Sequence, residues 1–255
     1  METGKLKEKL FNGDVCLGTW LFIPSQDIPE IIALAGLDFV VIDMEHSPIS
    51  YETMRSMITG SEVRGITPIV RPSSLNQSDI LRALDTGAHG VHMPQINTCY
   101  DSKKFIEFSK YYPLGKRGMA SSTRAGKYNL SMTHSHMKKA NNDLLNIISL
   151  ESLESINELD KFLDMEEIDV IYIGPYDLSQ SLGVPGEVNS KPVLKEMEKV
   201  FKRITNRNKI AGTFANSKEQ AKLFIETGVT YLTCETDGTL LCSAYSALKK
   251  EILGS

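Results

Sequence analysis

Phe39-Val40-Val41-Ile42-Asp43-Met44-Glu45-His46 is the stretch that decides the fold of this chain, because a continuous apolar run ends in reactive side chains. The same order recurs at three further places, where Arg71, Glu151 and Asp177 close or shortly follow apolar runs. Runs without polar alternation indicate parallel strands that are buried on both faces. The carboxyl ends of parallel strands converge, and parallel α/β folds place their chemistry at that end. We therefore expect these side chains to lie together at the open end that the carboxyl ends of the strands form, which we call the mouth.

Eight short strand-like runs can be counted, and most are followed by an amphipathic helical segment. Strand–helix alternation repeated eight times favours a closed (β/α)₈ barrel, the TIM-barrel fold, over an open doubly wound sheet. Among the helical segments, those at 76–86 and 217–227 have Ser78 and Ser217 as candidate N-caps. The predicted strands are residues 15–20, 39–43, 67–71, 90–93, 147–151, 169–173, 210–214 and 231–234.

Length and composition agree with one α/β domain over residues 1–255. The chain has 255 residues, 41% of them hydrophobic and 24% charged, and a TIM barrel typically has about 250. A net charge of −4 gives no electrostatic footprint for nucleic acid or an anionic membrane. The four cysteines lack zinc-like spacing and predict reduced thiols. The charged first residues lack the apolar region of a secretory signal, so we expect a cytoplasmic protein.

The segment 113–143 interrupts the strand–helix rhythm. We expect a long insertion after a strand, at the mouth of the barrel, where such insertions usually carry function. Ser121, Ser122 and Arg124 within it are weak candidates for contacts to a carboxylate or phosphate.

The final segment, 237–253, predicts a helix with an apolar stripe that includes Leu240, Leu241 and Leu248. The simpler interpretation is the eighth helix of the barrel, packed on its own strands. The alternative is a helix that packs against another subunit.

Glu151 and Asp177 follow neighbouring runs, so their carboxylates can approach each other. Two unpaired anions side by side repel, and one would stay protonated. A divalent cation removes this conflict, and ligation by carboxylates and water suits Mg²⁺ or Mn²⁺. The alternatives are that Glu151 pairs with an arginine and that Asp177 caps a short helix beginning at Leu178. Their position at adjacent strand ends favours the metal site.

His46 is the candidate general acid/base, because either Asp43 or Glu45 could fix its tautomer and raise its basicity. Arg71 emerges from an apolar run, so it must pair with a buried acid, for which Asp85 is the nearest candidate, or face the mouth. At the mouth it would offset the charge of a developing enolate.

Gly174-Pro175-Tyr176-Asp177 is the candidate substrate-binding turn. Glycine lets the backbone approach a ligand closely, and the amides of a turn that enters a helix bind a carboxylate. His89 and His92 flank the fourth predicted strand on opposite faces. We assign no function to either of them, nor to His134 and His136.

Five motifs together resemble the HpcH/HpaI aldolase family of metal-dependent pyruvate aldolases, which act on 4-hydroxy-2-oxo acids. The motifs occur in the family's order, and the resemblance covers nearly the whole chain. They are Val41-Ile42-Asp43-Met44-Glu45-His46, Val70-Arg71-Pro72-Ser73, Lys116-Arg117-Gly118, Ser149-Leu150-Glu151-Ser152 and Ile173-Gly174-Pro175-Tyr176-Asp177-Leu178-Ser179.

The resemblance implies a role for each matching residue. Glu151 and Asp177 match the ligands of a divalent metal, Mg²⁺ or Mn²⁺, with Co²⁺ or Zn²⁺ as further candidates. His46 matches the catalytic base, Asp43 the acid paired with that base, and Arg71 the arginine that steadies the pyruvate enolate. Asp85 matches an acid that supports the site of a neighbouring subunit, while Gly174, Tyr176 and Asp177 match the stretch that grips the pyruvyl carboxylate.

The resemblance also implies an assembly and a reaction. The family exchanges its last helix between protomers and commonly forms hexamers built from dimers, which favours the intersubunit interpretation of 237–253. The expected reaction cleaves or forms a 4-hydroxy-2-oxo acid, with pyruvate and an aldehyde as the other side. No lysine ends a predicted strand at the mouth, which disfavours a Schiff-base mechanism.

Two departures from the family pattern leave the substrate open. Ser149, a further residue that the resemblance places at the substrate, stands where better-known members carry glutamine, and Tyr176 stands where many carry alanine. The alternatives are a lyase for CoA thioesters of the malyl- or citryl-CoA type and a non-catalytic barrel that binds a keto acid.

Overall fold

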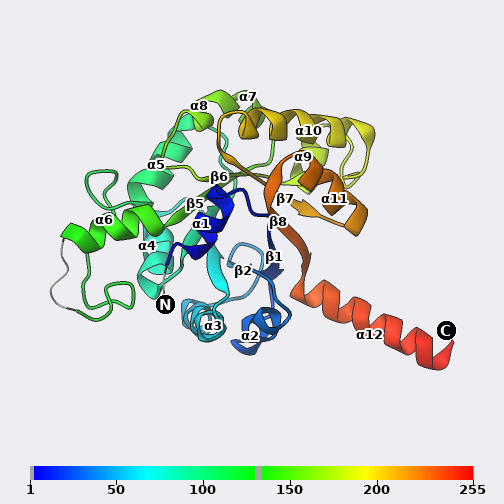
Figure 1. The fold of residues 1–255 in the computed structure, drawn as a ribbon, viewed down its shortest axis with the longest axis horizontal. Coiled ribbons are helices and arrows are strands. Elements are labelled where there is room, and N and C mark those ends of the chain that lie inside the picture. Colours follow the sequence, from blue (N-terminus) through cyan, green and yellow to red (C-terminus); the bar gives the residue numbers. More distant parts are fainter. Residues whose placement is uncertain (1–2, 130–133, 255) are drawn as a thin grey trace.

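The computed structural model describes residues 3–129 and 134–254, and its centre is a closed barrel of eight parallel strands. Each strand pairs with the next one in the chain, and the last pairs with the first (Figure 1). The expected (β/α)₈ barrel is therefore confirmed. The strands are β1 (Cys16–Leu21), β2 (Phe39–Asp43), β3 (Thr67–Arg71), β4 (Gly90–Met93), β5 (Leu145–Leu150), β6 (Val170–Ile173), β7 (Ile210–Ala215) and β8 (Val229–Thr236).

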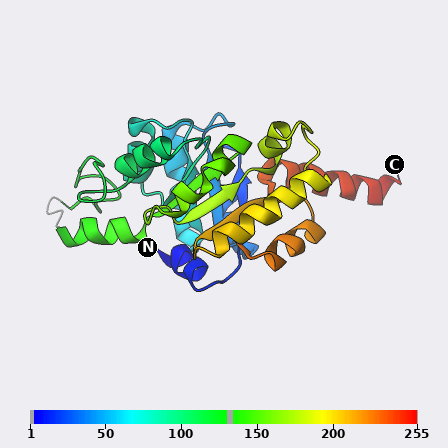
Figure 2. The same cartoon turned by 90° about the horizontal axis from the view of Figure 1, so that it is seen from above.

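Helices connect the strands and surround the barrel, as Figures 1 and 2 show. Within the described residues they are α1 (Lys5–Phe11), α2 (Asp27–Leu34), α3 (Tyr51–Arg64), α4 (Gln77–Thr86), α5 (Cys99–Ser109), α6 (His134–Asp143), α7 (Leu153–Asn157), α8 (Leu159–Leu163), α9 (Pro175–Ser181), α10 (Lys191–Thr205), α11 (Lys218–Glu226) and α12 (Asp237–Leu253).

The strands are apolar on both faces because each face packs against a different part of the core. In β2, Phe39 and Val41 belong to the cluster inside the barrel, while Val40 and Ile42 pack outward against residues of α3. The Phe39 ring also stacks on that of Tyr231 across the interior, with the ring centroids 4.3 Å apart. This two-sided burial is the reason that the strands read as continuous apolar runs.

Local capping groups set the helix boundaries. Ser217 caps α11 as expected, because its side chain accepts a hydrogen bond from the Gln220 amide at 3.1 Å. The prediction of Ser78 as a cap was wrong by two residues. Asn76 caps α4 instead, and its side chain accepts the hydrogen bond of the Ser78 amide at 2.8 Å.

The long insertion lies at the other end of the barrel from the expected one. It connects α5 to β5, so it precedes a strand rather than following one. The described parts of the expected insertion, 113–129 and 134–143, therefore belong to the end where the strands begin, and the expectation that they line the mouth is wrong. Residues 130–133 of this segment lie outside the described residues.

Helix α12 projects away from the barrel (Figures 1 and 2). Its predicted bounds are confirmed, but its interpretation as the eighth barrel helix is wrong, because Leu240, Tyr245 and Ile252 are 58%, 70% and 69% exposed. Its first residue anchors it to the barrel. The buried Asp237 carboxylate accepts hydrogen bonds from the backbone amides of Phe22 (3.0 Å) and Ile23 (2.9 Å), just beyond β1.

Among the described residues, no helix has the length and apolar character needed to cross a bilayer.

Candidate active site

The centre of the mouth is an ion pair between the last residues of two adjacent strands. Asp43 ends β2, Arg71 ends β3, and the two are direct partners in the strand register. Arg71 Nε donates to Asp43 Oδ1 at 3.1 Å, and Nη2 pairs with Oδ2. The Asp43 carboxylate is fully buried. Arg71 therefore pairs with a buried acid and also stands at the mouth, but the acid is Asp43 and not the expected Asp85.

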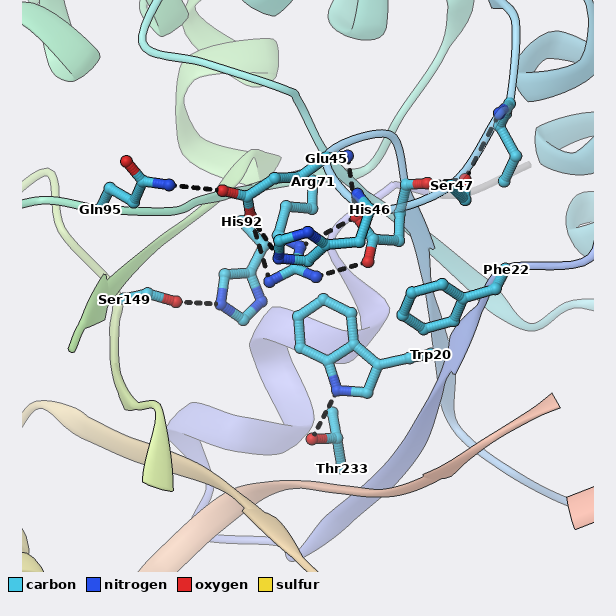
Figure 3. Close-up of polar contacts among 12 residues, drawn as sticks. Trp20, Phe22, Glu45, His46, Ser47, Arg71, His92, Gln95, Ser149 and Thr233 are labelled. Carbon is cyan, nitrogen blue, oxygen red and sulfur yellow. Dashed lines mark hydrogen bonds and ion pairs between the residues drawn. The ribbon is translucent and has the colours of Figure 1, made fainter. Parts of the chain in front are cut away.

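Two further side chains hold the Arg71 guanidinium in place. Glu45 Oε2 lies 3.3 Å from Nη1, and the guanidinium carbon lies 4.3 Å from the centre of the Trp20 ring (Figure 3). Gln95, which follows β4, fixes Glu45 in turn through a hydrogen bond of 2.8 Å. Burial acts to lower the pKa of Arg71, but Asp43 and Glu45 outweigh it and raise that pKa. The result is a permanent cation with a fixed orientation.

His46 lies at the edge of this cluster with most of its side chain exposed. Its Nε2 atom is 3.6 Å from Glu45 Oε2. Asp43 contacts His46 only through the backbone, because its carboxylate accepts the His46 amide hydrogen bond at 3.2 Å. Of the two acids expected as partners of the imidazole, Glu45 is therefore the one beside it, and the pairing with Asp43 that the resemblance implied is corrected.

Glu151 and Asp177 meet beside Gly174, between the end of β5 and the start of α9. A Cβ atom added at Gly174 would lie 3.2 Å from Glu151 Cγ and 3.9 Å from Asp177 Oδ2, so both side chains border the same backbone position. Burial raises the pKa of Glu151 to about 7, and the negative charges of Asp177 and Glu45 add to the shift. The two acids predicted from separate runs therefore come together.

Neither alternative for these acids fits the structure. Helix α9 begins at Pro175 with Gly174 as its N-cap, so Asp177 lies inside the first turn and does not cap a helix starting at Leu178. Among the described residues, Glu151 forms no ion pair with an arginine.

The donor set fits a cation that is held only in part by protein. In the described part of the chain, no group of three or more histidine, cysteine or acidic residues is arranged to hold a metal. The protein ligands available at this position are therefore two carboxylates, those of Glu151 and Asp177. Burial and the charge of Asp177 raise the pKa of Glu151, and a bound divalent cation would reverse that shift. Mg²⁺ is typically held by one or two carboxylates together with water and substrate oxygens.

Tyr176 forms part of the wall of the candidate site, and Ser149 forms part of its floor. The Tyr176 hydroxyl donates to Asn216 Oδ1 at 2.8 Å, and its ring lies 6.4 Å from that of Phe214. Ser149 is buried on β5, and its hydroxyl lies 2.8 Å from His92 Nε2.

Asp85 lies away from the mouth. It is the last residue but one of α4 and forms an ion pair of 2.9 Å with Arg117, at the end of the barrel where the strands begin. A cavity of about 430 Å³ opens there, lined partly by His89, Arg117 and Arg124. Arg124 and His89 both bind Glu62, so Arg124 already has an acid partner within the chain.

Trp20, Gln95 and His92 complete the mouth and its floor without having been predicted as site residues. Of these three residues, Gln95 could have been found from the sequence, because it follows the fourth strand just as the other site residues follow their strands. Trp20 and His92 stand within strands, where a sequence pattern does not distinguish a core ring from a ring beneath a site.

The molecule is thus a (β/α)₈ barrel with a clamped arginine and two close acids at its mouth. The chain belongs to the HpcH/HpaI aldolase/citrate lyase family, whose sequence profile matches residues 17–244. It is accordingly an enzyme, a lyase of the aldolase type.

Relatives of the chain agree with this assignment. A protein named 2-keto-3-deoxy-L-rhamnonate aldolase, from Escherichia coli O17:K52:H18, is 30% identical over 95% of this chain and 90% of its own length. The structure of a family protein from Burkholderia cenocepacia J2315 superposes with a TM-score of 0.92 at 27% identity, covering 98% of this chain and 99% of that one. A protein named citrate synthase SbnG has a TM-score of 0.87 at 30% identity, covering 98% and 99%.

Proposed function

We propose that this enzyme is a metal-dependent aldolase that cleaves or forms 4-hydroxy-2-oxo acids, with pyruvate and an aldehyde as the second pair of reactants. The observation that carries the proposal is the close approach of Glu151 and Asp177 at Gly174, next to the clamped Arg71. The relative named as an aldolase for 2-keto-3-deoxy-L-rhamnonate supports a 2-oxo sugar acid as one candidate substrate.

Glu151 and Asp177 would hold the metal, Mg²⁺ or Mn²⁺, with Co²⁺ or Zn²⁺ as further candidates. When bound, such a cation supplies Lewis-acid stabilisation of the charge that develops on the substrate's oxo oxygen, worth several kcal/mol.

Arg71 would stabilise the same negative charge. Its guanidinium does not have to be ordered during the reaction, because Asp43, Glu45 and Trp20 already fix it. A preorganised cation of this kind costs no reorganisation when charge develops.

His46 would move the proton at the 4-hydroxyl oxygen, and removal of that proton lets the C3–C4 bond break. Its ring is mostly exposed at the mouth, and Glu45 would orient the ring and stabilise its protonated form. The first-turn amides of α9 at Tyr176 and Asp177 face no earlier carbonyl within the helix, so they are available for the substrate carboxylate.

A Schiff-base mechanism finds no support at the mouth. Burial lowers the pKa of Lys110 to about 8, as an imine-forming lysine would need. Its Nζ atom, however, donates to the carbonyls of Asn141 (2.6 Å) and Leu144 (3.3 Å), before β5 begins. This lysine lies at the opposite end of the barrel from Glu151.

The test is a screen for pyruvate release from 4-hydroxy-2-oxo acids of varied length and charge, with Mg²⁺ or Mn²⁺ and with EDTA. We expect release that stops with EDTA, and no covalent adduct after borohydride treatment with pyruvate. A trapped adduct would contradict the metal-dependent route. Acyl-CoA substrates test the thioester lyase, and absence of pyruvate α-proton exchange would point to a non-catalytic keto-acid-binding barrel.

We propose further that α12 packs against another copy of the chain, in a homo-oligomer of the hexameric, trimer-of-dimers kind. Its exposed apolar stripe includes Leu241 (43% exposed) and Leu248 (49%), and contiguous exposed apolar surface marks an interaction site.

Replacing both Leu241 and Leu248 with glutamate is expected to dissociate the oligomer to a species near the chain mass of 28.4 kDa. Two charges would otherwise be buried in an apolar contact. Light scattering coupled to size exclusion measures the mass. Ser246→Glu on the same exposed helix is the control and should keep the oligomer intact. A wild-type chain that stays monomeric at micromolar concentration would contradict the proposal.

A further inference from the structure

A completely buried histidine lies directly beneath the proposed site. His92 belongs to β4 and points into the barrel, where its ring centroid is 5.1 Å from that of Trp20 and 4.6 Å from that of Tyr172. Its Nε2 atom is 2.8 Å from Ser149 Oγ, while its Nδ1 atom is buried and has no hydrogen-bond partner. Figure 3 shows the ring between Ser149 and the Arg71 guanidinium.

The surroundings of the ring determine where its proton lies. Nδ1 is a buried atom without a partner in either neutral tautomer, as a donor if it carries the proton and as a lone pair if it does not. A proton on Nδ1 would place that N–H in the positive field of Arg71. With the proton on Nε2, the unpartnered atom is a lone pair, which the same field stabilises. Burial, helped by the charge of Arg71, lowers the pKa of His92 well below its ordinary value, so the ring stays neutral.

The tautomer then decides what Ser149 can do. If Nε2 donates to Ser149 Oγ, the serine accepts that hydrogen bond and keeps its own proton for another acceptor. Within the described residues, the Ser149 hydroxyl has no other hydrogen-bond partner. Ser149 precedes Glu151 by two residues, so both side chains leave β5 and its extension on the same face, with the serine one layer deeper.

We propose that His92 is a positioning residue that presents the Ser149 hydroxyl as a hydrogen-bond donor to an oxygen of the bound 2-oxo acid. The proposal rests on the aldolase function proposed above and adds a specificity element on the floor of that site. A hydroxyl held in this way favours substrates with a carboxylate or oxo oxygen at the floor over analogues that lack one.

Kinetics and pyruvate binding test the contact. Ser149→Ala is expected to raise the KM for the 2-oxo acid, and the Kd for pyruvate, about 10-fold through loss of one hydrogen bond, with a smaller effect on kcat. His92→Met should do the same, and the double variant should lose no more than either single one, because both remove the same contact. His92→Gln should restore binding, since its amide can replace Nε2–H. Ser56→Ala on the exposed face of α3 is the control and should leave KM unchanged.

A spectroscopic measurement on the wild-type enzyme does not depend on any variant folding. A ¹⁵N–¹H correlation spectrum should show His92 neutral with its proton on Nε2, and His92→Gln identifies the signal by its disappearance. Pyruvate with Mg²⁺ should shift this signal. A proton on Nδ1, or an unchanged KM in Ser149→Ala, would overturn the positioning role while leaving the aldolase proposal intact. If the wild-type enzyme neither binds pyruvate nor exchanges its α-protons, both proposals fail.

Discussion

Glu151→Gln is expected to reduce aldolase activity by about 10³-fold or more, because it removes one of the two proposed metal ligands and its negative charge. The loss corresponds to about 4 kcal/mol of transition-state stabilisation, within the range that a Lewis-acid metal supplies. Glutamine has nearly the same shape, so the barrel should stay folded. Isothermal titration with Mn²⁺ should show weakened metal binding in parallel with the loss of turnover.

Glu154→Gln is the matched control, because Glu154 is exposed on α7 only three residues away. It should bind Mn²⁺ and turn over like the wild-type enzyme. Full activity of Glu151→Gln, or wild-type activity that persists in EDTA, would remove the metal site from the proposal.

Arg71→Met should destabilise the fold strongly as well as impair catalysis. It leaves the fully buried Asp43 carboxylate without its cation, and removal of one partner from a buried ion pair typically costs about 3–5 kcal/mol. Activity should also fall, since the cation that we propose to stabilise the developing enolate is gone. Urea unfolding followed by circular dichroism measures the change in the free energy of unfolding.

The control for this prediction is Arg64→Met. Arg64 pairs with Glu30 on the surface, where its side chain is 49% exposed, and such pairs contribute about 0–1 kcal/mol. If both variants unfold at the same urea concentration, the Arg71–Asp43 pair contributes no more to the free energy of unfolding than an exposed pair does. Arg71→Met/Asp43→Leu should recover part of the stability but none of the activity.

The barrel could be predicted because burial on both faces leaves a direct mark on the sequence. The bounds of β2, β3 and β4 agree with prediction to the residue, and the other strands differ at their ends. The acids at the mouth could be located for the same reason. A side chain at the carboxyl end of a buried parallel strand lies at the mouth, where the neighbouring strands also end. The approach of Glu151 and Asp177 to each other therefore followed from the strand pattern alone.

Partners across the structure could not be predicted in this way. Asp85 and Arg71 are both charged residues near the same strand–helix unit, yet one binds Arg117 and the other Asp43. Which acid meets which arginine depends on the end of the barrel each occupies. The α5–β5 insertion was misplaced for a related reason. An insertion before α5 would lie at the mouth, whereas this one follows α5 and therefore lies at the end of the barrel where the strands begin.

His92 and α12 show two other limits. A histidine within or next to a strand gives no sign of whether its ring will face helices, as that of His89 does toward Glu62, or the floor of a site, as that of His92 does. The stripe of α12 shows that the helix has an apolar side. It does not show whether the surface that covers that side belongs to the same chain.

The Asp237 carboxylate ties the first turn of α12 to the amides of Phe22 and Ile23, and Trp20, on which Arg71 rests, lies only two residues before Phe22. A displacement of the protruding helix would therefore reach the rim beside the guanidinium by two routes, through the chain connection to β8 and through the Asp237 carboxylate. We therefore expect that a neighbouring copy held against α12 would also restrict the motion of the Trp20 ring on which the cation rests.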